Sequence, residues 1–227
     1  MGVIHGIQDI VTQNRVLYYD AANSTSYPGT GTTWYDLMGN SNATIDGATF
    51  SSDNRGIFDF DGSNDFISAT STSSVAFGTG DFAVGIWVRV DNLTDNHMIF
   101  ETRSGVGSTQ DGFVFFVYGG NNDEWQVWTA GASKIAGASS SVAVDTWYHA
   151  IITRISGTTT LYVNSVSVGS FSDSYNYTND DLLLGKNASS ASWLNGKMAL
   201  CVIYKGKGLT ASEVSRNYNV NKGRFGL

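Results

Sequence analysis

The segment WYHAIITRISGTTTLYVNSVSV, residues 147 to 168, decides the fold of this chain. Side chains alternate in type over residues 147 to 152, which is the period of two that is typical of a strand with two different faces. A Gly-Thr-rich turn follows, and the alternation resumes at Leu161. It ends at Asn164, where an Asn-Ser pair predicts a tight turn. The segment therefore predicts a β-hairpin.

The composition indicates one large β domain that folds in a cytoplasm. A chain of 227 residues fits one sandwich, and its single cysteine excludes an intrachain disulfide. Cys201 lies in the apolar run MALCVIY, which predicts a buried thiol. The start MGVIHGIQDI has neither the basic nor the apolar region of a signal peptide, and no apolar run reaches the length of a membrane span. A formal charge of −7 disfavours nucleic acid as a partner.

Short strands separated by Gly- and Asn-rich turns occupy most of the chain from residue 15 onward. Residues 81 to 90 form the clearest one, with apolar side chains at every second position from Phe82. This spacing of strands and turns predicts a β-sandwich or jelly roll over residues 15 to 227. Residues 1 to 14 are predicted to be an N-terminal arm that is disordered or pairs with a neighbouring subunit.

One short helix is predicted near the C-terminus. Thr210 and Glu213 form a T-x-x-E capping box, and Leu209 is placed to contact Val214 one turn later. Gly223 is expected to end this helix.

Six segments in order resemble the laminin-G-like jelly rolls of the concanavalin A superfamily. They are FDGSNDFI (60 to 67), DFAVGIWVRV (81 to 90), WYHAIITR (147 to 154), LYVNSVSVG (161 to 169), LLLGKN (182 to 187) and LNGKMALCVIYKGKGLTASEVSRNY (194 to 218). The resemblance implies an all-β, concanavalin A-like (laminin-G-like) jelly-roll β-sandwich. That fold serves recognition and assembly more often than catalysis.

The two ends of the domain resemble versions of this module in structural proteins of bacteriophage particles. The matching stretches are VLYYDAANSTSYPGTGTTWYDLMGNSNATIDGATF (16 to 50) and LTASEVSRNYNVNKGRFGL (209 to 227). This resemblance implies a non-catalytic virion structural protein, such as a capsid decoration protein, a fibre or a tail accessory. We therefore expect a homo-oligomer that contacts other virion proteins and resides in the virion after folding in the host cytoplasm.

The sequence predicts no catalytic site. Glycoside hydrolysis by the retaining mechanism needs two carboxylates about 5 Å apart, whereas Glu101, Glu124 and Glu213 are widely spaced along the chain. The three histidines, at positions 5, 97 and 149, do not cluster, and His149 is interpreted as a packed strand residue. Glycine-rich stretches lack the lysine and the strand-to-helix setting of a phosphate loop. We expect a protein that is not an enzyme.

Calcium is the one cofactor that the sequence allows, so the prediction is either no cofactor or Ca²⁺. Laminin-G-like modules often hold this ion through Asp and Asn oxygens at a rim of the sandwich. Asp61, Asn64 and Asp65 are the candidate metal ligands, with Asp180, Asp181 and Asn187 as a second group. The alternative, a solvated turn in which an aspartate caps its own backbone, is favoured for the first group.

Recognition of host cell-surface glycans is the alternative function. Sugars bind on aromatic rings, with amide and carboxylate groups holding their hydroxyls. The candidate residues lie in two loop regions. One contains Tyr118, Asn121, Asn122, Asp123, Trp125 and Trp128, and the other contains Tyr175, Asn176, Tyr177 and Trp193. Strand alternation places Trp125 and Trp128 on opposite faces, so one of the two is expected to be in the core.

Overall fold

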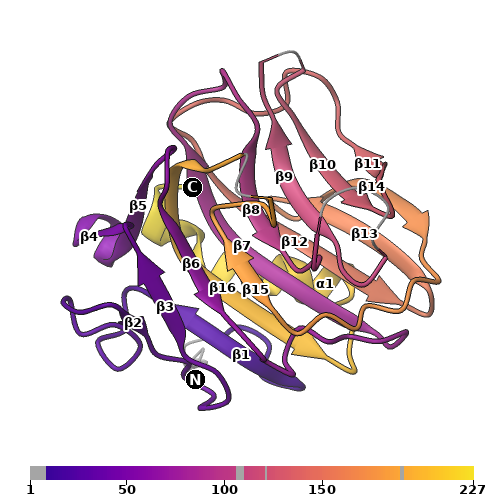
Figure 1. Ribbon diagram of the computed structural model, residues 1–227, viewed down its shortest axis with the longest axis horizontal. Helices are drawn as coiled ribbons and strands as arrows, with labels where there is room; N and C mark the ends of the chain where they lie inside the picture. Colours follow the sequence, from indigo (N-terminus) through magenta and orange to yellow (C-terminus); the bar gives the residue numbers. More distant parts are fainter. Residues whose placement is uncertain (1–8, 106–109, 121, 190–191) are drawn as a thin grey trace, which may run out of the picture.

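The computed structural model of the protein describes residues 9–105, 110–120, 122–189 and 192–227. Two antiparallel sheets stack face to face, and one α-helix lies against the outside of one of them (Figure 1). This is the predicted all-β sandwich with a short C-terminal helix. In the described part of the chain, no helix is both long and apolar enough to cross a membrane.

One sheet, sheet A, consists of β1 (Arg15–Asp20), β4 (Thr49–Ser51), β5 (Ile57–Asp61), β7 (Phe82–Val90), β12 (Trp147–Ile155), β13 (Thr158–Val163), β14 (Val166–Ser172) and β16 (Asn195–Lys205). Its strand order is β14–β13–β12–β7–β16–β5–β4, and β1 also pairs with β16. The other sheet, sheet B, consists of β2 (Thr33–Trp34), β3 (Ala43–Asp46), β6 (Phe66–Ala69), β8 (His97–Glu101), β9 (Val114–Tyr118), β10 (Glu124–Thr129), β11 (Ala132–Ala136) and β15 (Leu182–Leu184). Its order is β11–β10–β9–β8–β15–β6–β3–β2.

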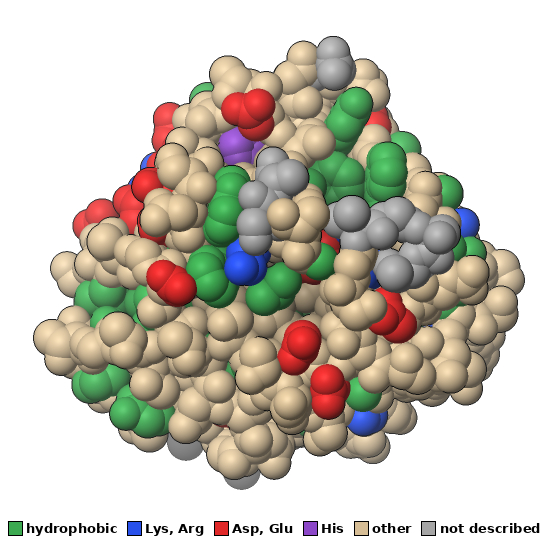
Figure 2. All heavy atoms as spheres, in the orientation of Figure 1, with side chains coloured by type: hydrophobic (Ala, Val, Ile, Leu, Met, Phe, Trp, Pro, Cys, Tyr) green, Lys and Arg blue, Asp and Glu red, His purple; other side chains and the backbone are tan. Residues whose placement is uncertain are grey.

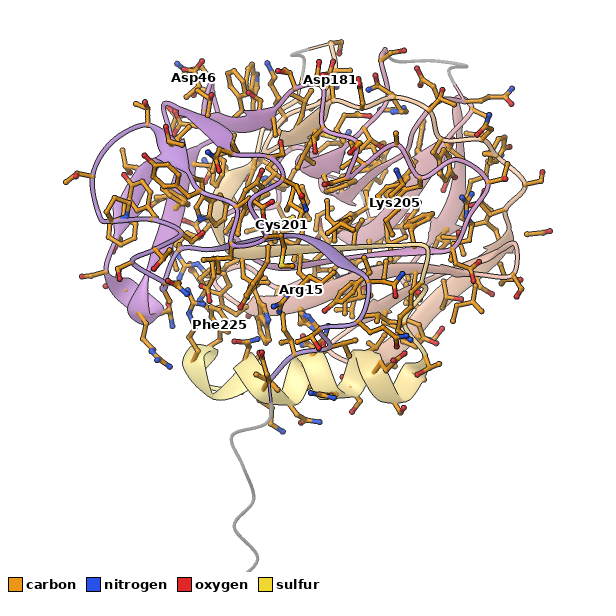
Figure 3. All side chains as sticks on the ribbon, turned by 90° about the horizontal axis from the view of Figure 1, so that it is seen from below. Arg15, Asp46, Asp181, Cys201, Lys205 and Phe225 are labelled. Atoms are coloured by element: carbon orange, nitrogen blue, oxygen red, sulfur yellow. The ribbon has the colours of Figure 1, made fainter. Side chains whose placement is uncertain are left out.

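The main core lies between the two sheets. Phe82, Val84, Ile86 and Val88, the predicted apolar face of β7, are all fully buried there. Cys201 is also in this core as a free thiol, and burial raises its pKa well above the ordinary value (Figure 3). The prediction of a buried thiol is confirmed.

β12, the first strand of the hairpin that decides the fold, is buried on both faces. Ala150 and Ile152 point into the core between the sheets, whereas Trp147 and Ile151 lie in a second apolar cluster on the outside of sheet A. The turn between β13 and β14 is left-handed at Asn164 and Ser165, with φ values of 47° and 71°, as a tight hairpin turn requires. β12 therefore carries apolar side chains on both faces because one face packs in the core and a helix covers the other.

That helix is α1 (Ala211–Asn221), and the capping box predicted for it is confirmed. The Thr210 hydroxyl accepts the Glu213 N–H, and the Glu213 carboxylate accepts the Thr210 N–H. The α-helix ends at Asn221 with Lys222 as its C-cap, so Gly223 is the first residue beyond the cap, as predicted. The chain continues through a 3₁₀ turn, η2 (Lys222–Phe225), and the left-handed residue is Gly226, because the extra turn buries Phe225 against Trp87 and Trp147. A second 3₁₀ turn, η1, spans Asp53–Arg55.

Part of the predicted N-terminal arm packs against the domain. Residues 1 to 8 lie outside the described residues, but Ile10 and Val11 are buried in the cluster beneath α1. The Val11 N–H donates to Asn217 Oδ1 of α1 at 2.8 Å, and Tyr204 donates its hydroxyl to the Val11 carbonyl at 2.8 Å. The chain thus enters the domain on the sheet A side.

Candidate functional site

The outer face of sheet B carries the candidate site. In the described part of the chain the α-helix covers sheet A, so this opposite face has no helix over it (Figure 3). Along β8, β9 and β10 every second side chain points outward, and Met98, Val114 and Phe116 form an apolar floor there. Hydrophobic side chains gather on this face where β9 and β10 run (Figure 2).

A cavity of about 230 Å³ lies over this floor, and two half-buried aromatic side chains line it. The Phe116 ring is 5.9 Å from the Trp128 ring and 6.4 Å from the Tyr118 ring, both measured between centroids. Both pairs are edge-to-face, so each rim ring stands at a steep angle to the floor. The cavity therefore combines an apolar base with steep aromatic walls.

A chain of hydrogen bonds along β10 holds the Trp128 ring in place. The indole N–H donates to Gln126 Oε1, and Gln126 Nε2 donates to Glu124 Oε1 at 2.5 Å. These residues are two apart on one strand, which brings their side chains to the same face. Among the described residues, no donor bonds to the second oxygen of Glu124.

An ion pair closes the opposite end of the site. Arg103 donates from Nε and Nη2 to the two oxygens of Glu101, both at 2.7 Å. Burial raises the pKa of Glu101 even though the bonds from Arg103 oppose the shift. Two of the three guanidinium nitrogens of Arg103 therefore bond to Glu101.

A second hollow of about 310 Å³ adjoins the cavity and contains Trp193. The Phe66 ring lies 6.2 Å from the Trp193 ring, and the Lys186 ammonium lies 3.6 Å from the centroid of Phe66. Asn96 and Ser192 line both hollows, which makes them neighbours on one surface.

The structure brings four of the predicted glycan-binding residues to this face. Tyr118 and Trp128 line the cavity, Trp193 lines the adjoining hollow, and Asn122 donates to Glu124 at 3.4 Å. Asp123 takes a left-handed conformation, φ 50°, in the turn before β10, and its carbonyl accepts the Val142 N–H. Asn121 lies outside the described residues.

Two of the predicted glycan-binding residues belong to the interior instead. Trp125 is 2% exposed and packs between the sheets, and Tyr177 is 1% exposed, with its hydroxyl donated to Asp173 at 3.1 Å. Neither ring offers a face to a ligand, so their assignment to the site is corrected. Tyr175 stacks near Tyr177, under Lys134, away from the cavity.

Sequence reasoning missed the floor and the polar residues of the site. Met98, Phe116, Gln126 and Arg103 were not singled out. The signal was present in β9, where the side chains between the core positions are also apolar or aromatic: Val114, Phe116 and Tyr118. When a strand is apolar on both faces, one face packs in the core and the other is a second apolar surface that something else must cover or bind.

The candidate calcium ligands are engaged with nearby backbone. Asp61 Oδ1 accepts the N–H groups of Ser63 and Asn64, and the buried Asp65 accepts the Asp61 N–H at 3.0 Å. Burial raises the pKa of Asp65. Calcium needs six to eight oxygens, and in the described residues no group of three or more His, Cys, Asp or Glu side chains could hold a metal. In the positions they occupy, these residues do not form a calcium site. Calcium binding by the protein stays a prediction.

The two glutamates of this face, Glu101 and Glu124, lie far apart. Register places Glu101 level with Trp128, across β9, and Glu124 is four residues along β10 from Trp128. Four residues of strand span about 13 Å. Glycosidases place their carboxyl groups about 5 Å apart, or about 6.5–9.5 Å in inverting enzymes.

The fold defines a lectin-like β-sandwich domain. Residues 60–215 match the family model described as the concanavalin A-like lectin/glucanases superfamily, and the chain belongs to this superfamily. No curated protein matches the sequence.

Solved structures with the same fold include parts of larger proteins. The Trypanosoma rangeli sialidase superposes with a TM-score of 0.68 at 15% identity, over 92% of this chain and 33% of the sialidase chain. The same sialidase in complex with sialic acid gives a TM-score of 0.69 at 17% identity, over 92% and 33% of the two chains. The botulinum neurotoxin serotype D binding domain gives 0.66 at 16%, over 91% and 51%. This chain spans about a third of the sialidase chains, and likeness at these identities shows the fold alone.

Proposed function

We propose that this protein is a non-catalytic carbohydrate-binding module whose ligand lies on the outer face of sheet B. The observation that carries the proposal is the cavity lined by Tyr118 and Trp128, with the hydrogen-bonded chain from Trp128 to Glu124 beside it. The wide separation of Glu101 and Glu124 supports binding without hydrolysis.

Carbohydrate fits this chemistry better than other ligand classes. The C–H faces of a sugar ring pack on aromatic rings, and its hydroxyls need fixed donors and acceptors. Phe116 and Trp128 supply the apolar surface, whereas Asn96 and Glu124 supply polar groups nearby. Because the Trp128 indole is already bonded to Gln126, little side-chain freedom remains to be lost on binding.

Replacing Trp128 by alanine is expected to weaken glycan binding by about tenfold or more, which is about 1.4 kcal/mol. The ring is one wall of the cavity, and its loss removes most of the stacking surface. A glycan array would identify the ligand, and isothermal titration calorimetry would measure the loss. Tyr35 is an exposed aromatic residue outside the cavity, so Tyr35→Ala is the matched control and should bind as the parent does. Equal affinity of the parent and Trp128→Ala would contradict this site.

The setting we propose is the surface of a virus particle, as the resemblance of the chain ends to bacteriophage structural proteins implies. Supporting this, Asp9, the first described residue, accepts a hydrogen bond at its carbonyl from Arg216 of α1, and α1 lies on the side of the sandwich opposite sheet B (Figure 3). An attachment at the N-terminal side would leave the binding face pointing outward. Homo-oligomer formation and contacts with other virion proteins belong to the same proposal.

Deletion of residues 1 to 8 tests this display role. Extending the deletion to residue 14 would remove the buried Ile10 and Val11 and confound attachment with folding. We expect the shorter deletion to keep glycan binding but to lose oligomers, seen by size-exclusion chromatography with light scattering, and to lose attachment to particles. A deletion variant that still oligomerises and attaches would contradict a role for this segment.

A further inference from the structure

The two hollows on the outer face of sheet B are parts of one surface. Asn96 and Ser192 line both, so the path from Trp128 to Trp193 runs over shared residues. Sites for small ligands usually enclose about 300–1,000 Å³. At about 230 Å³ and about 310 Å³, each hollow is at or below the low end of that range, and together they fall well inside it.

We propose that this surface binds an uncharged oligosaccharide of at least two sugar residues, with one residue against Trp128 and another against Trp193, and that it discriminates against acidic sugars. This inference rests on the proposed carbohydrate-binding function and adds the length and charge class of the ligand.

The second aromatic position, Trp193, is also held by contacts with its neighbours. The Lys186 ammonium lies 5.7 Å from the Trp193 ring centroid as well as 3.6 Å from that of Phe66, so the cation bridges the two rings. A backbone bridge also pairs Lys186 with Trp193. Two aromatic rings fixed at the two ends of a shared surface are suited to successive residues of a sugar chain.

The charges around this surface are unfavourable for an anion. Of its two cations, Arg103 is bonded through Nε and Nη2 to Glu101, and Lys186 lies on the Phe66 ring. Three carboxylates, those of Glu101, Glu124 and Asp95, outnumber them, and the whole chain carries a formal charge of −7. A sialic acid, uronic acid or sulfated sugar would meet net negative charge and two cations that already have partners. A neutral sugar meets no such cost.

The experiment is calorimetry with neutral oligosaccharides of one to six residues, built on glucose, galactose, mannose or N-acetylglucosamine, and with the same chains ending in sialic acid or sulfate. We expect affinity to rise about tenfold or more between one residue and three or four. The acidic versions should bind about tenfold more weakly at low salt, with a smaller difference at 0.5 M salt because screening weakens the repulsion.

Trp193→Ala should reduce the affinity for long chains to that for short ones, and Trp193→Phe, which keeps an aromatic ring, should retain the length dependence. An unchanged unfolding midpoint would verify that each variant is folded. Equal binding of single sugars and long chains, tighter binding of acidic chains, or a length dependence that survives Trp193→Ala would overturn the inference while leaving the proposed function standing. Failure of every carbohydrate to bind would overturn both.

Discussion

Replacement of Arg154 by methionine is expected to lower the free energy of unfolding by about 3–5 kcal/mol, the cost typical of breaking a buried ion pair from one side. The Arg154 side chain is fully buried. Its guanidinium donates to the carbonyls of Gly78, Gly80 and Tyr175 and pairs with Asp173 at 3.5 Å. Methionine fills a similar volume, but it leaves the Gly80 and Tyr175 carbonyls without the arginine donor and the Asp173 carboxylate without its cation. The Gly78 carbonyl loses one of its two donors and keeps the Tyr177 N–H.

The measurement is equilibrium unfolding in urea, with the free energy extrapolated to water. Arg55 is exposed, so Arg55→Met is the matched control and should change stability by no more than about 0.5 kcal/mol. If Arg154→Met does not fold, Asp173→Asn provides the second variant. It keeps an acceptor for Thr159 and Tyr177 and should cost less than the loss of the arginine. A loss below about 1 kcal/mol for Arg154→Met would show that solvent reaches this pair.

Acid is expected to destabilise the protein through His149. Its imidazole is buried between sheet A and α1, stacked at 4.9 Å on Trp87 and at 6.1 Å on Tyr218. Burial lowers the pKa of His149 to about 3 from an ordinary value of 6.5. Among the described residues, its Nδ1 atom has no hydrogen-bond partner that could stabilise a positive charge.

The pH window follows from these two pKa values. Below pH 6.5 the unfolded chain takes up a proton at His149, whereas the folded chain stays neutral there until about pH 3. The unfolded state therefore binds more protons in this window, and the free energy of unfolding falls as the pH is lowered. At about 1.4 kcal/mol per pH unit, the loss is roughly 2 kcal/mol at pH 5 and roughly 4–5 kcal/mol at pH 3. Above pH 6.5 this histidine has no effect.

His149→Phe keeps an aromatic ring against Trp87 and removes the titrating group, so it should lose most of this pH dependence. Urea unfolding of the parent and the variant at pH 7.5 and pH 4.5 isolates the contribution of His149, because the other titrating groups are common to both. His149→Gln, neutral and polar, serves if phenylalanine disturbs the packing. The same slope with pH in the parent and both variants would show that another group is responsible.

The outer faces of the two sheets differ in what covers them. Sheet A is covered by α1 and by residues 9 to 11, which seal Trp87 and His149 away from solvent. Sheet B keeps its outer face open, and the apolar side chains on it are shared among β8, β9 and β10. Because proteins with one fold have many functions, we infer carbohydrate binding from the residues of this face and not from membership of the superfamily.

The sequence determined the local features of this protein. The period of two in residues 147 to 152, the capping box at Thr210 and the left-handed turn at Asn164 are all set by residues close together in the chain, so each could be predicted. Alternation along β10 also placed Trp125 and Trp128 on opposite faces of the strand. It could not determine which of the two is buried, because a strand has no inner face until a second sheet packs on it.

Only the tertiary structure decided how distant segments meet. The helix that covers His149 begins more than sixty residues after it, and Trp193 reaches the site from a loop far in sequence from Asn96 and Phe116. Beyond the end of α1, the chain continues as a 3₁₀ turn to Gly226 because Phe225 gains burial against sheet A, which outweighs the local preference of Gly223 for a left-handed conformation. Burial of apolar surface acts between residues that chain folding brings together, and their spacing along the sequence does not record it.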